Sequence, residues 1–224
     1  MKRAVVLLSG GLDSATALYW VRSQGYQPTA LTVHYGQRHA RELSAARTLA
    51  RRAGADWVPV RLSLPWLKAS SLVDRKKRLP DLPAGRIGKG PIPSTYVPGR
   101  NTVFLSLAVS LADAKGAEAL VIGSNAQDYS GYPDCRPEFI AAFQKTARLG
   151  TRRGCEGKRL ALLAPLQRLD KAGIVRLARR LEVPLELTWS CYQGGRRPCG
   201  RCDSCKLRAR GFAAAGATDP ALSR

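Results

Sequence analysis

Val5-Val6-Leu7-Leu8-Ser9-Gly10-Gly11-Leu12-Asp13-Ser14 is the stretch of sequence that decides the fold class. Its four consecutive apolar residues are typical of a β-strand that is buried on both faces, as in a parallel sheet. Two glycines then allow a sharp turn, and a helix is expected to begin near Asp13-Ser14 with Ala17, Leu18 and Val21 facing the core. A buried strand that turns directly into a helix is the first unit of a parallel α/β fold.

The same alternation continues along most of the chain. Strands are expected at 29–35, 56–62, 119–123 and 160–163, and helices at 39–53, after residue 100, at 138–149 and from Asp170 onward. The helix after residue 100 is expected to turn Phe104, Leu107, Ala108 and Leu111 inward. Segment 63–100 interrupts the pattern with prolines and glycines, which predicts a long loop of the kind that often carries function. We therefore predict an α/β fold with a doubly wound, mostly parallel sheet.

The turn after the first strand has the chemistry of a phosphate site. Glycines let the backbone approach a ligand closely, and a helix N-terminus offers free N–H groups and a positive dipole end. Ser9 and Ser14 can add hydroxyl donors. Asp13 would repel a phosphate unless a cation lies between them, so it is either a Mg²⁺ ligand or a simple helix cap. The turn matches neither the Gly-Lys-Ser/Thr loop nor the dinucleotide fingerprint.

The hexapeptide Ser9–Ser14 resembles the signature of the PP-loop ATP pyrophosphatases, which adenylate an oxygen atom and release pyrophosphate. The resemblance implies an adenine nucleotide alpha hydrolase-like fold with the adenine near Leu31–Val33. It also implies that ATP binds along one continuous run: Leu8, Ser9, Gly10, Gly11, Leu12, Asp13, Ser14, Ala15, Thr16, Ala17 and Leu18.

Four cysteines near the C-terminal end have metal-ligand spacing: Cys191, Cys199, Cys202 and Cys205. Four thiols with two tight steps and intervening glycines suit tetrahedral Zn²⁺, and an iron–sulfur cluster is the alternative. With four protein ligands the site would be closed and structural. The change in character after Pro184 predicts a small zinc module at 188–224, appended to a main domain at 1–187.

Two further segments are dense in polar side chains. Arg100 and Asn101 precede an expected helix, where Arg100 could clamp a phosphate or carboxylate and Asn101 could cap the helix or contact a base edge. Segment 123–139 follows a buried strand and combines aromatic side chains with carboxylates, a set that suits a planar purine-like ring. The alternative for this segment is a solvated Tyr-Pro turn.

Together with the cysteines, these segments resemble the 7-cyano-7-deazaguanine synthase family (QueC). The likeness covers Ser9–Ser14, Tyr35–His39, Tyr96–Asn101, Gly131–Phe139 and the tail through Gly211-Phe212, while the loop at 74–93 is longer and more basic than expected. It implies that ATP with Mg²⁺, 7-carboxy-7-deazaguanine and free ammonia react to give the nitrile, through adenylated acid and amide intermediates, in a homodimeric ligase of queuosine biosynthesis that holds one structural zinc per chain.

The resemblance also implies roles for individual residues. Asp13, Arg100 and Lys171 would be catalytic, with Lys171 stabilising the departing pyrophosphate. The deazaguanine would be held by Asp128, Tyr132, Asp134 and Arg136.

The composition sets limits on partners and location. The 224 residues carry a net charge of +21 and are 45% hydrophobic, so the chain can bury a core. We expect a cytoplasmic protein without a membrane span, because no apolar run reaches roughly 18 residues. Three basic stretches at 68–100, 145–159 and 191–210 supply most of the excess charge, and we expect all three in or beside the ATP site. They leave three rivals open: an enzyme acting directly on tRNA, a QueC-like enzyme modifying DNA or protein, and a nucleic-acid binder with a vestigial nucleotide fold.

Overall fold

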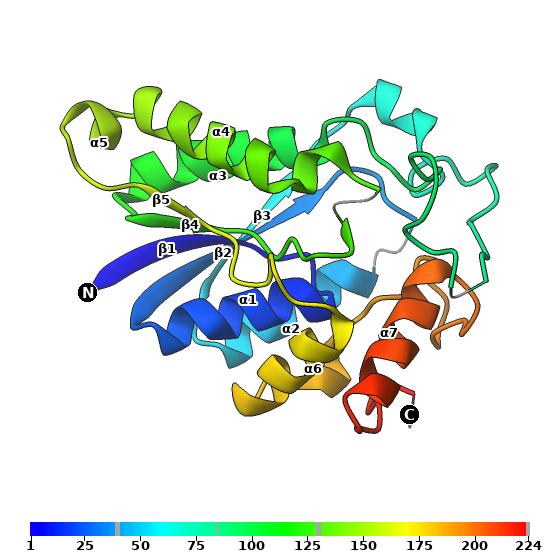
Figure 1. Ribbon diagram of the computed structural model, residues 1–224. Coiled ribbons are helices and arrows are strands. Elements are labelled where there is room, and N and C mark those ends of the chain that lie inside the picture. Colours follow the sequence, from blue (N-terminus) through cyan, green and yellow to red (C-terminus); the bar gives the residue numbers. More distant parts are fainter. Residues whose placement is uncertain (39–40, 84, 129–130, 223–224) are drawn as a thin grey trace.

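A five-stranded parallel sheet organises the computed structural model, which describes residues 1–38, 41–83, 85–128 and 131–222 (Figure 1). The strands are β1 Lys2–Leu7, β2 Tyr26–His34, β3 Asp56–Arg61, β4 Ala119–Val121 and β5 Ala161–Leu163. Their order is β3-β2-β1-β4-β5, and every neighbouring pair is parallel. The chain therefore winds first to one side of β1 and then to the other, which makes the end of β1 the switch point where open α/β sheets bind ligands.

Seven α-helices accompany the strands in the described residues. Their bounds are α1 Leu12–Ser23, α2 Arg41–Arg52, α3 Arg100–Lys115, α4 Pro137–Leu149, α5 Arg152–Cys155, α6 Lys171–Arg180 and α7 Asp203–Ala214. Short 3₁₀ turns occur at η1 Pro65–Ala69, η3 Pro133–Cys135 and η4 Leu185–Leu187. No helix of the described ranges is both long and apolar enough to cross a membrane.

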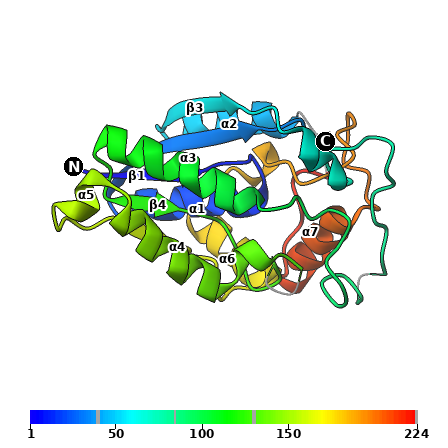
Figure 2. The same ribbon diagram turned by 90° about the horizontal axis from the view of Figure 1, so that it is seen from above.

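The two faces of the sheet build two hydrophobic cores, and β1 contributes to both. Ala4, Val6 and Leu8 point into the core with α1, α2 and α6, whereas Val5 and Leu7 point into the core with α3 and α4. Figures 1 and 2 show the sheet between these two helical layers. The continuous apolar run of β1 is thus explained by burial on both faces.

Helix α7 extends the first core and packs against α6 (Figure 1). Phe212 of α7 is 2% exposed and lies in the same cluster as Ile174 and Ala178 of α6. The division into domains at 1–187 and 188–224 stays a prediction.

The expected doubly wound sheet is confirmed, and the differences from the expected elements are local. Helix α3 buries Asn101, Leu105, Ala108 and Ala112, so its inward face is rotated from the predicted one and leaves Phe104, Leu107 and Leu111 only partly buried. The sequence pattern does not reveal this rotation, because apolar residues also lie on both sides of the buried stripe of α3 and widen the apparent inward face. Asp170 caps α6 as predicted, accepting a hydrogen bond from the Gly173 N–H. The predicted helix start at His39 lies outside the described residues.

Candidate active site

The phosphate loop between β1 and α1 is held by its own serines. The Ser9 and Ser14 hydroxyl groups lie 3.0 Å apart, and the Ser9 N–H donates to Ser14 Oγ over 3.2 Å. Gly10 has a φ of +92°, and a Cβ there would lie 2.3 Å from the Glu42 carbonyl oxygen of α2. Glycine is therefore required at this turn both for its backbone angle and for the close approach of α2.

Asp13 lies in the first turn of α1 and is not its cap, because the N-cap residue is Gly11. Its Oδ2 atom pairs with Lys171 at the start of α6 and accepts a 3.0 Å hydrogen bond from Asn125 Nδ2. Its Oδ1 atom is buried and has no hydrogen-bond partner among the described residues. A carboxylate oxygen left in this way beside a phosphate loop is a fitting ligand for a hard cation.

Two carboxylates and one lysine make the polar centre of the site. Burial lowers the pKa of Lys171, but the charges of Asp13 and Asp128 outweigh it and the net pKa is raised. Burial raises the pKa of Asp128 to about 6, although Lys171 opposes this rise. Lys171 is therefore a firmly protonated cation beside the loop, and the pKa of Asp128 is raised toward neutral pH.

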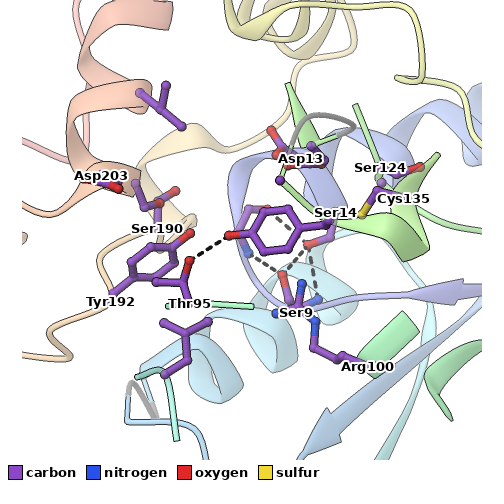
Figure 3. Close-up of a pocket in the computed structure, with 18 of the residues that line it drawn as sticks. Ser9, Asp13, Ser14, Thr95, Arg100, Ser124, Cys135, Ser190, Tyr192 and Asp203 are labelled. Carbon is purple, nitrogen blue, oxygen red and sulfur yellow. Dashed lines mark hydrogen bonds between the residues drawn. The ribbon is translucent and has the colours of Figure 1, made fainter. Parts of the chain in front are cut away.

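A cavity of about 870 Å³ opens beside the loop and is lined by Asp13, Arg100, Asp128, Tyr132 and Lys171. Figure 3 shows Ser9, Asp13 and Ser14 on one part of its wall and Thr95, Ser190 and Tyr192 on another. Leu31, Thr32 and Val33 also line it, at the place where the resemblance puts adenine. The loop of 63–100 closes one side, with Pro80, Arg86, Lys89 and Pro93 on the wall.

Arg100 begins α3, and its guanidinium group lies near the hydroxyl groups of Tyr35 and Tyr132. It hydrogen-bonds Tyr35, and although burial lowers its pKa, Tyr35 and the neighbouring acidic groups raise the net pKa. Tyr132 shares a 2.9 Å hydrogen bond with Thr95. A permanent cation among aromatic side chains suits an anionic group attached to a planar ring.

Other predicted residues lie away from the cavity wall. Asp134 is 6% exposed, and its carboxylate accepts the Asn101 N–H over 2.8 Å, so it holds the start of α3 rather than facing the cavity. Arg136 is exposed and is the N-cap residue of α4. Ala15, Ala17 and Leu18 are core residues of α1, and the Thr16 hydroxyl donates to the Leu12 carbonyl. Substrate binding by Asp134 and Arg136 and ATP binding by residues 15–18 stay predictions from the resemblance.

The four predicted metal ligands converge at the start of α7. The sulfur atoms of Cys191, Cys199, Cys202 and Cys205 all lie within 4.8 Å of one another. Tetrahedral zinc–sulfur bonds place ligand sulfurs about 3.8 Å apart, so the set matches such an ion. The Cys199 N–H donates to Cys191 Sγ and the Cys202 N–H to Cys199 Sγ, each over 3.3 Å, which stabilises thiolates. The arrangement can therefore hold a metal ion.

One expectation about the basic stretches is wrong. Segment 145–159 lies at the opposite end of the sheet from the cavity, next to the starts of the strands (Figure 1). The Arg152 N–H contacts Asp113 near the end of α3, and the chain then enters β5 from this side. Only the stretches 68–100 and 191–210 contribute residues to the cavity. The error arose because a segment before a parallel strand reaches the amino end of the sheet, whereas ligands bind at the carboxyl end.

Sequence reasoning did not single out Asn125. It is fully buried, and besides holding Asp13 it donates its N–H to Asp128 Oδ2 over 3.1 Å. Its position directly after a buried strand was the available signal, because that is where open α/β sheets place ligand contacts. Tyr129 and Ser130 of the same predicted segment lie outside the described residues.

Several solved structures have a similar fold. The structure described as NMN synthetase from Francisella tularensis has a TM-score of 0.52 and 16% identity, covering 99% of this chain and 81% of that chain. A predicted subunit of tRNA methyltransferase from Methanocaldococcus jannaschii has a TM-score of 0.50 and 19% identity, covering 80% and 75%. These likenesses concern the fold alone. Fold and phosphate loop together define an adenine nucleotide alpha hydrolase-like protein of the PP-loop class.

The sequence comparisons narrow this class to one family. The family model described as Queuosine biosynthesis protein QueC matches residues 3–216. The 7-cyano-7-deazaguanine synthase of Anaeromyxobacter sp. (strain Fw109-5) is 52% identical, covering 99% of this chain and 96% of the relative. That of Synechococcus elongatus is also 52% identical, covering 96% and 93%. The chain belongs to the QueC family, as its motifs predicted.

Proposed function

We propose that this chain converts 7-carboxy-7-deazaguanine and ammonia into 7-cyano-7-deazaguanine at the expense of ATP. The observation that carries the proposal is the meeting of Asp13, Lys171 and Asn125 at the mouth of the phosphate loop, beside a cavity of about 870 Å³. That volume is within the range of ligand sites. The family membership and the names of the relatives point to the same reaction.

In the first half-reaction, a carboxylate oxygen of the substrate attacks the α-phosphorus of ATP and pyrophosphate leaves. The free N–H groups at the start of α1 and the Ser9 and Ser14 hydroxyl groups would bind the leaving pyrophosphate. Lys171 is protonated and would stabilise the negative charge that builds on it. Ammonia then displaces AMP from the acyl-adenylate, which gives the amide.

In the second half-reaction, the amide oxygen attacks the α-phosphorus of a second ATP, and pyrophosphate leaves again. Loss of AMP and of the nitrogen-bound protons then forms the C≡N bond. One phosphate loop serves both steps because both activate an oxygen on the same carbon. No covalent bond to the protein is needed, so the chain contributes positioning and charge stabilisation.

Side chains of the cavity wall beyond the loop itself would bind the deazaguanine. Arg100 would pair with its carboxylate, Tyr132 would stack on or hydrogen-bond the ring, and Asp128 would accept from its N–H edge. The role of Asp134 would then be indirect, since it supports the start of the helix that carries Arg100. A substrate-binding role for Arg136 rests on the resemblance alone.

Two metals would complete the protein. Asp13 Oδ1 fits a Mg²⁺ ion that accompanies ATP and would neutralise phosphate charge. The four cysteines fit one structural Zn²⁺, and their free thiols agree with a cytoplasmic, reducing location. A homodimer is expected for the family, and light scattering of the purified protein tests it.

The test is to incubate the purified protein with 7-carboxy-7-deazaguanine, ATP, Mg²⁺ and ammonium. Product mass and AMP release are followed, and two AMP per nitrile are expected. A protein with full zinc content that yields neither amide nor nitrile would exclude the proposed reaction. Tight tRNA or DNA binding with a steep salt dependence, together with that failure, would favour the macromolecular alternative that the exposed basic residues of 75–89 keep open.

A further inference from the structure

Arg208 of α7 has every one of its N–H donors engaged inside the protein. The side chain forms a bidentate pair with Asp219, with Nε–Oδ2 at 2.7 Å and Nη2–Oδ1 at 2.9 Å. Both residues are less than a tenth exposed. The guanidinium carbon also lies 5.2 Å from the ring centre of Phe212. A planar, fully bonded guanidinium of this kind is held in a single position.

The remaining donors of Arg208 hold the segment that precedes the cysteine cluster. Nη1 donates to Thr188 Oγ1 over 2.7 Å and to Ser190 Oγ over 3.2 Å, and Nη2 donates to the Leu185 carbonyl over 3.2 Å. Segment 185–190 is irregular apart from η4, so these three contacts define its path across the end of the sheet.

That segment touches the phosphate loop directly. The Trp189 N–H donates to the Gly10 carbonyl over 2.9 Å. The Trp189 carbonyl oxygen lies 3.5 Å from the place where a Cβ on Gly11 would be. Arg208 therefore acts on the loop through Trp189, because it hydrogen-bonds Thr188 and Ser190 on either side of that residue.

Helix α7 touches the other side of the loop through Lys171. At Gly211 an added Cβ would lie 2.7 Å from Lys171 Cβ and 3.2 Å from the Lys171 carbonyl oxygen. The absence of a side chain at Gly211 lets α7 lie against the start of α6, and Lys171 reaches from there to Asp13. One turn of α7 thus contacts both the segment that holds the loop backbone and Lys171, the lysine that pairs with Asp13.

We propose that Arg208 and Gly211 are positioning residues that set the phosphate loop and Lys171 at the spacing needed for adenylation. The inference rests on the proposed function for its activity readout. It assigns the C-terminal helix a role in ATP chemistry besides carrying Cys205. Neither residue needs to touch the reacting atoms for this role, since a displacement of about 1 Å at a reacting centre costs on the order of 100-fold in rate.

Gly211→Ala tests the contact with Lys171, and Gly154→Ala is its matched control. At Gly154 of α5 an added Cβ would lie 1.7 Å from the Arg148 carbonyl oxygen, a more severe clash at the far end of the sheet. We expect Gly211→Ala to lower kcat about 10- to 100-fold and to weaken binding of a non-hydrolysable ATP analogue several-fold, at unchanged zinc content. Gly154→Ala should lower the melting temperature and leave kcat per folded molecule unchanged.

Arg208→Lys tests the contact of α7 with segment 185–190. It also keeps the inference testable if Gly211→Ala does not fold. Lysine keeps the charge and loses the planar fork, and Arg153→Lys in α5 is the control. We expect a kcat loss of the same order for Arg208→Lys and less than a twofold change for Arg153→Lys. If both α7 variants keep zinc, kcat and analogue affinity within twofold of wild type, the positioning role is wrong. If wild type itself makes no nitrile, the proposed function fails, and the analogue affinities still decide this inference.

Discussion

The two ends of the parallel sheet are both rich in charged side chains, but they use them in opposite ways. At the carboxyl end, Asp13, Lys171 and Asn125 form a contact network, in which one carboxylate oxygen of Asp13 has no hydrogen-bond partner within the part of the chain that the structure describes. At the amino end, the basic residues of 145–159 are mostly exposed, and Asp113 accepts the backbone N–H groups of Arg152 and Arg153 at the start of α5. Charge is organised for chemistry at one end and solvated at the other, although the sequence alone does not distinguish the basic stretch 145–159 from the stretches 68–100 and 191–210, which reach the cavity.

The largest expected effect comes from replacing one aspartate at each end of the sheet, Asp13 at the carboxyl end and Asp113 at the amino end. Asp13→Ala removes the partner of Lys171 and the candidate Mg²⁺ ligand, so AMP release should fall about 1,000-fold or more. Asp113→Ala should leave the rate within twofold. AMP is measured by chromatography and zinc by metal analysis. Loss of zinc in Asp13→Ala would show that Asp13 is a structural residue.

A cysteine at each end of the sheet allows the two ends to be compared for metal binding. Cys202→Ser removes one of four converging sulfurs and should release the metal and destabilise the fold by several kcal/mol. Cys155→Ser at the amino end changes an exposed thiol outside the cluster and should alter neither property. Metal content and thermal unfolding are the measurements. Full metal retention in Cys202→Ser would contradict a four-sulfur site.

The raised pKa of Asp128 predicts a pH-dependent stability. The folded protein binds this proton more tightly than the unfolded chain, whose ordinary value is 3.8, because burial raises the pKa to about 6. The cost of ionisation therefore appears as the pH rises from about 4 to 6 and persists above it. Asp128→Asn should raise stability at pH 8 by at most about 3 kcal/mol and have little effect at pH 4.

Melting curves of Asp128→Asn between pH 4 and pH 8 measure this difference. The control is Asp56→Asn at the start of β3, which removes only an exposed 3.5 Å ion pair with Lys115. Equal stabilisation of Asp128→Asn at both pH values would mean that Asp128 pays no ionisation cost in the folded state.

The smallest effect concerns the exposed arginines and lysines. Arg86 and Lys89 line the cavity and should attract anionic substrates, so Arg86→Gln with Lys89→Gln should raise the KM for ATP about three- to tenfold at low salt. Arg152→Gln with Arg159→Gln at the amino end removes the same charge and should change KM less than twofold. Equal effects of the two pairs would show that only net charge matters.

Much of the fold was predictable because its main signals are local. The apolar run at Val5–Leu8, the glycine pair and the Asp170 cap each predict an element within a few residues. The face of α3 was not predictable to the residue, since Asn101 is buried where it hydrogen-bonds Asp134 and Cys135. That burial depends on a segment more than thirty positions away.

The candidate site divides in the same way. The phosphate loop and the four cysteines are continuous motifs, and their residues do converge. Asn125, Trp189 and Arg208 act through contacts between distant segments, which no short motif contains.

The sequence by itself determined the parallel α/β class, the family, the phosphate loop and the metal-ligand set, because short motifs carry the loop and the ligands and several such motifs along the chain carry the family. Only the tertiary structure decided that Lys171 pairs with Asp13, that Asp134 supports a helix start, and that segment 145–159 lies at the end of the sheet away from the cavity. The physical reason is that side-chain pairing and burial depend on where strands end in space. A parallel sheet brings the carboxyl ends of distant strands together and sends the segments before them to the opposite edge.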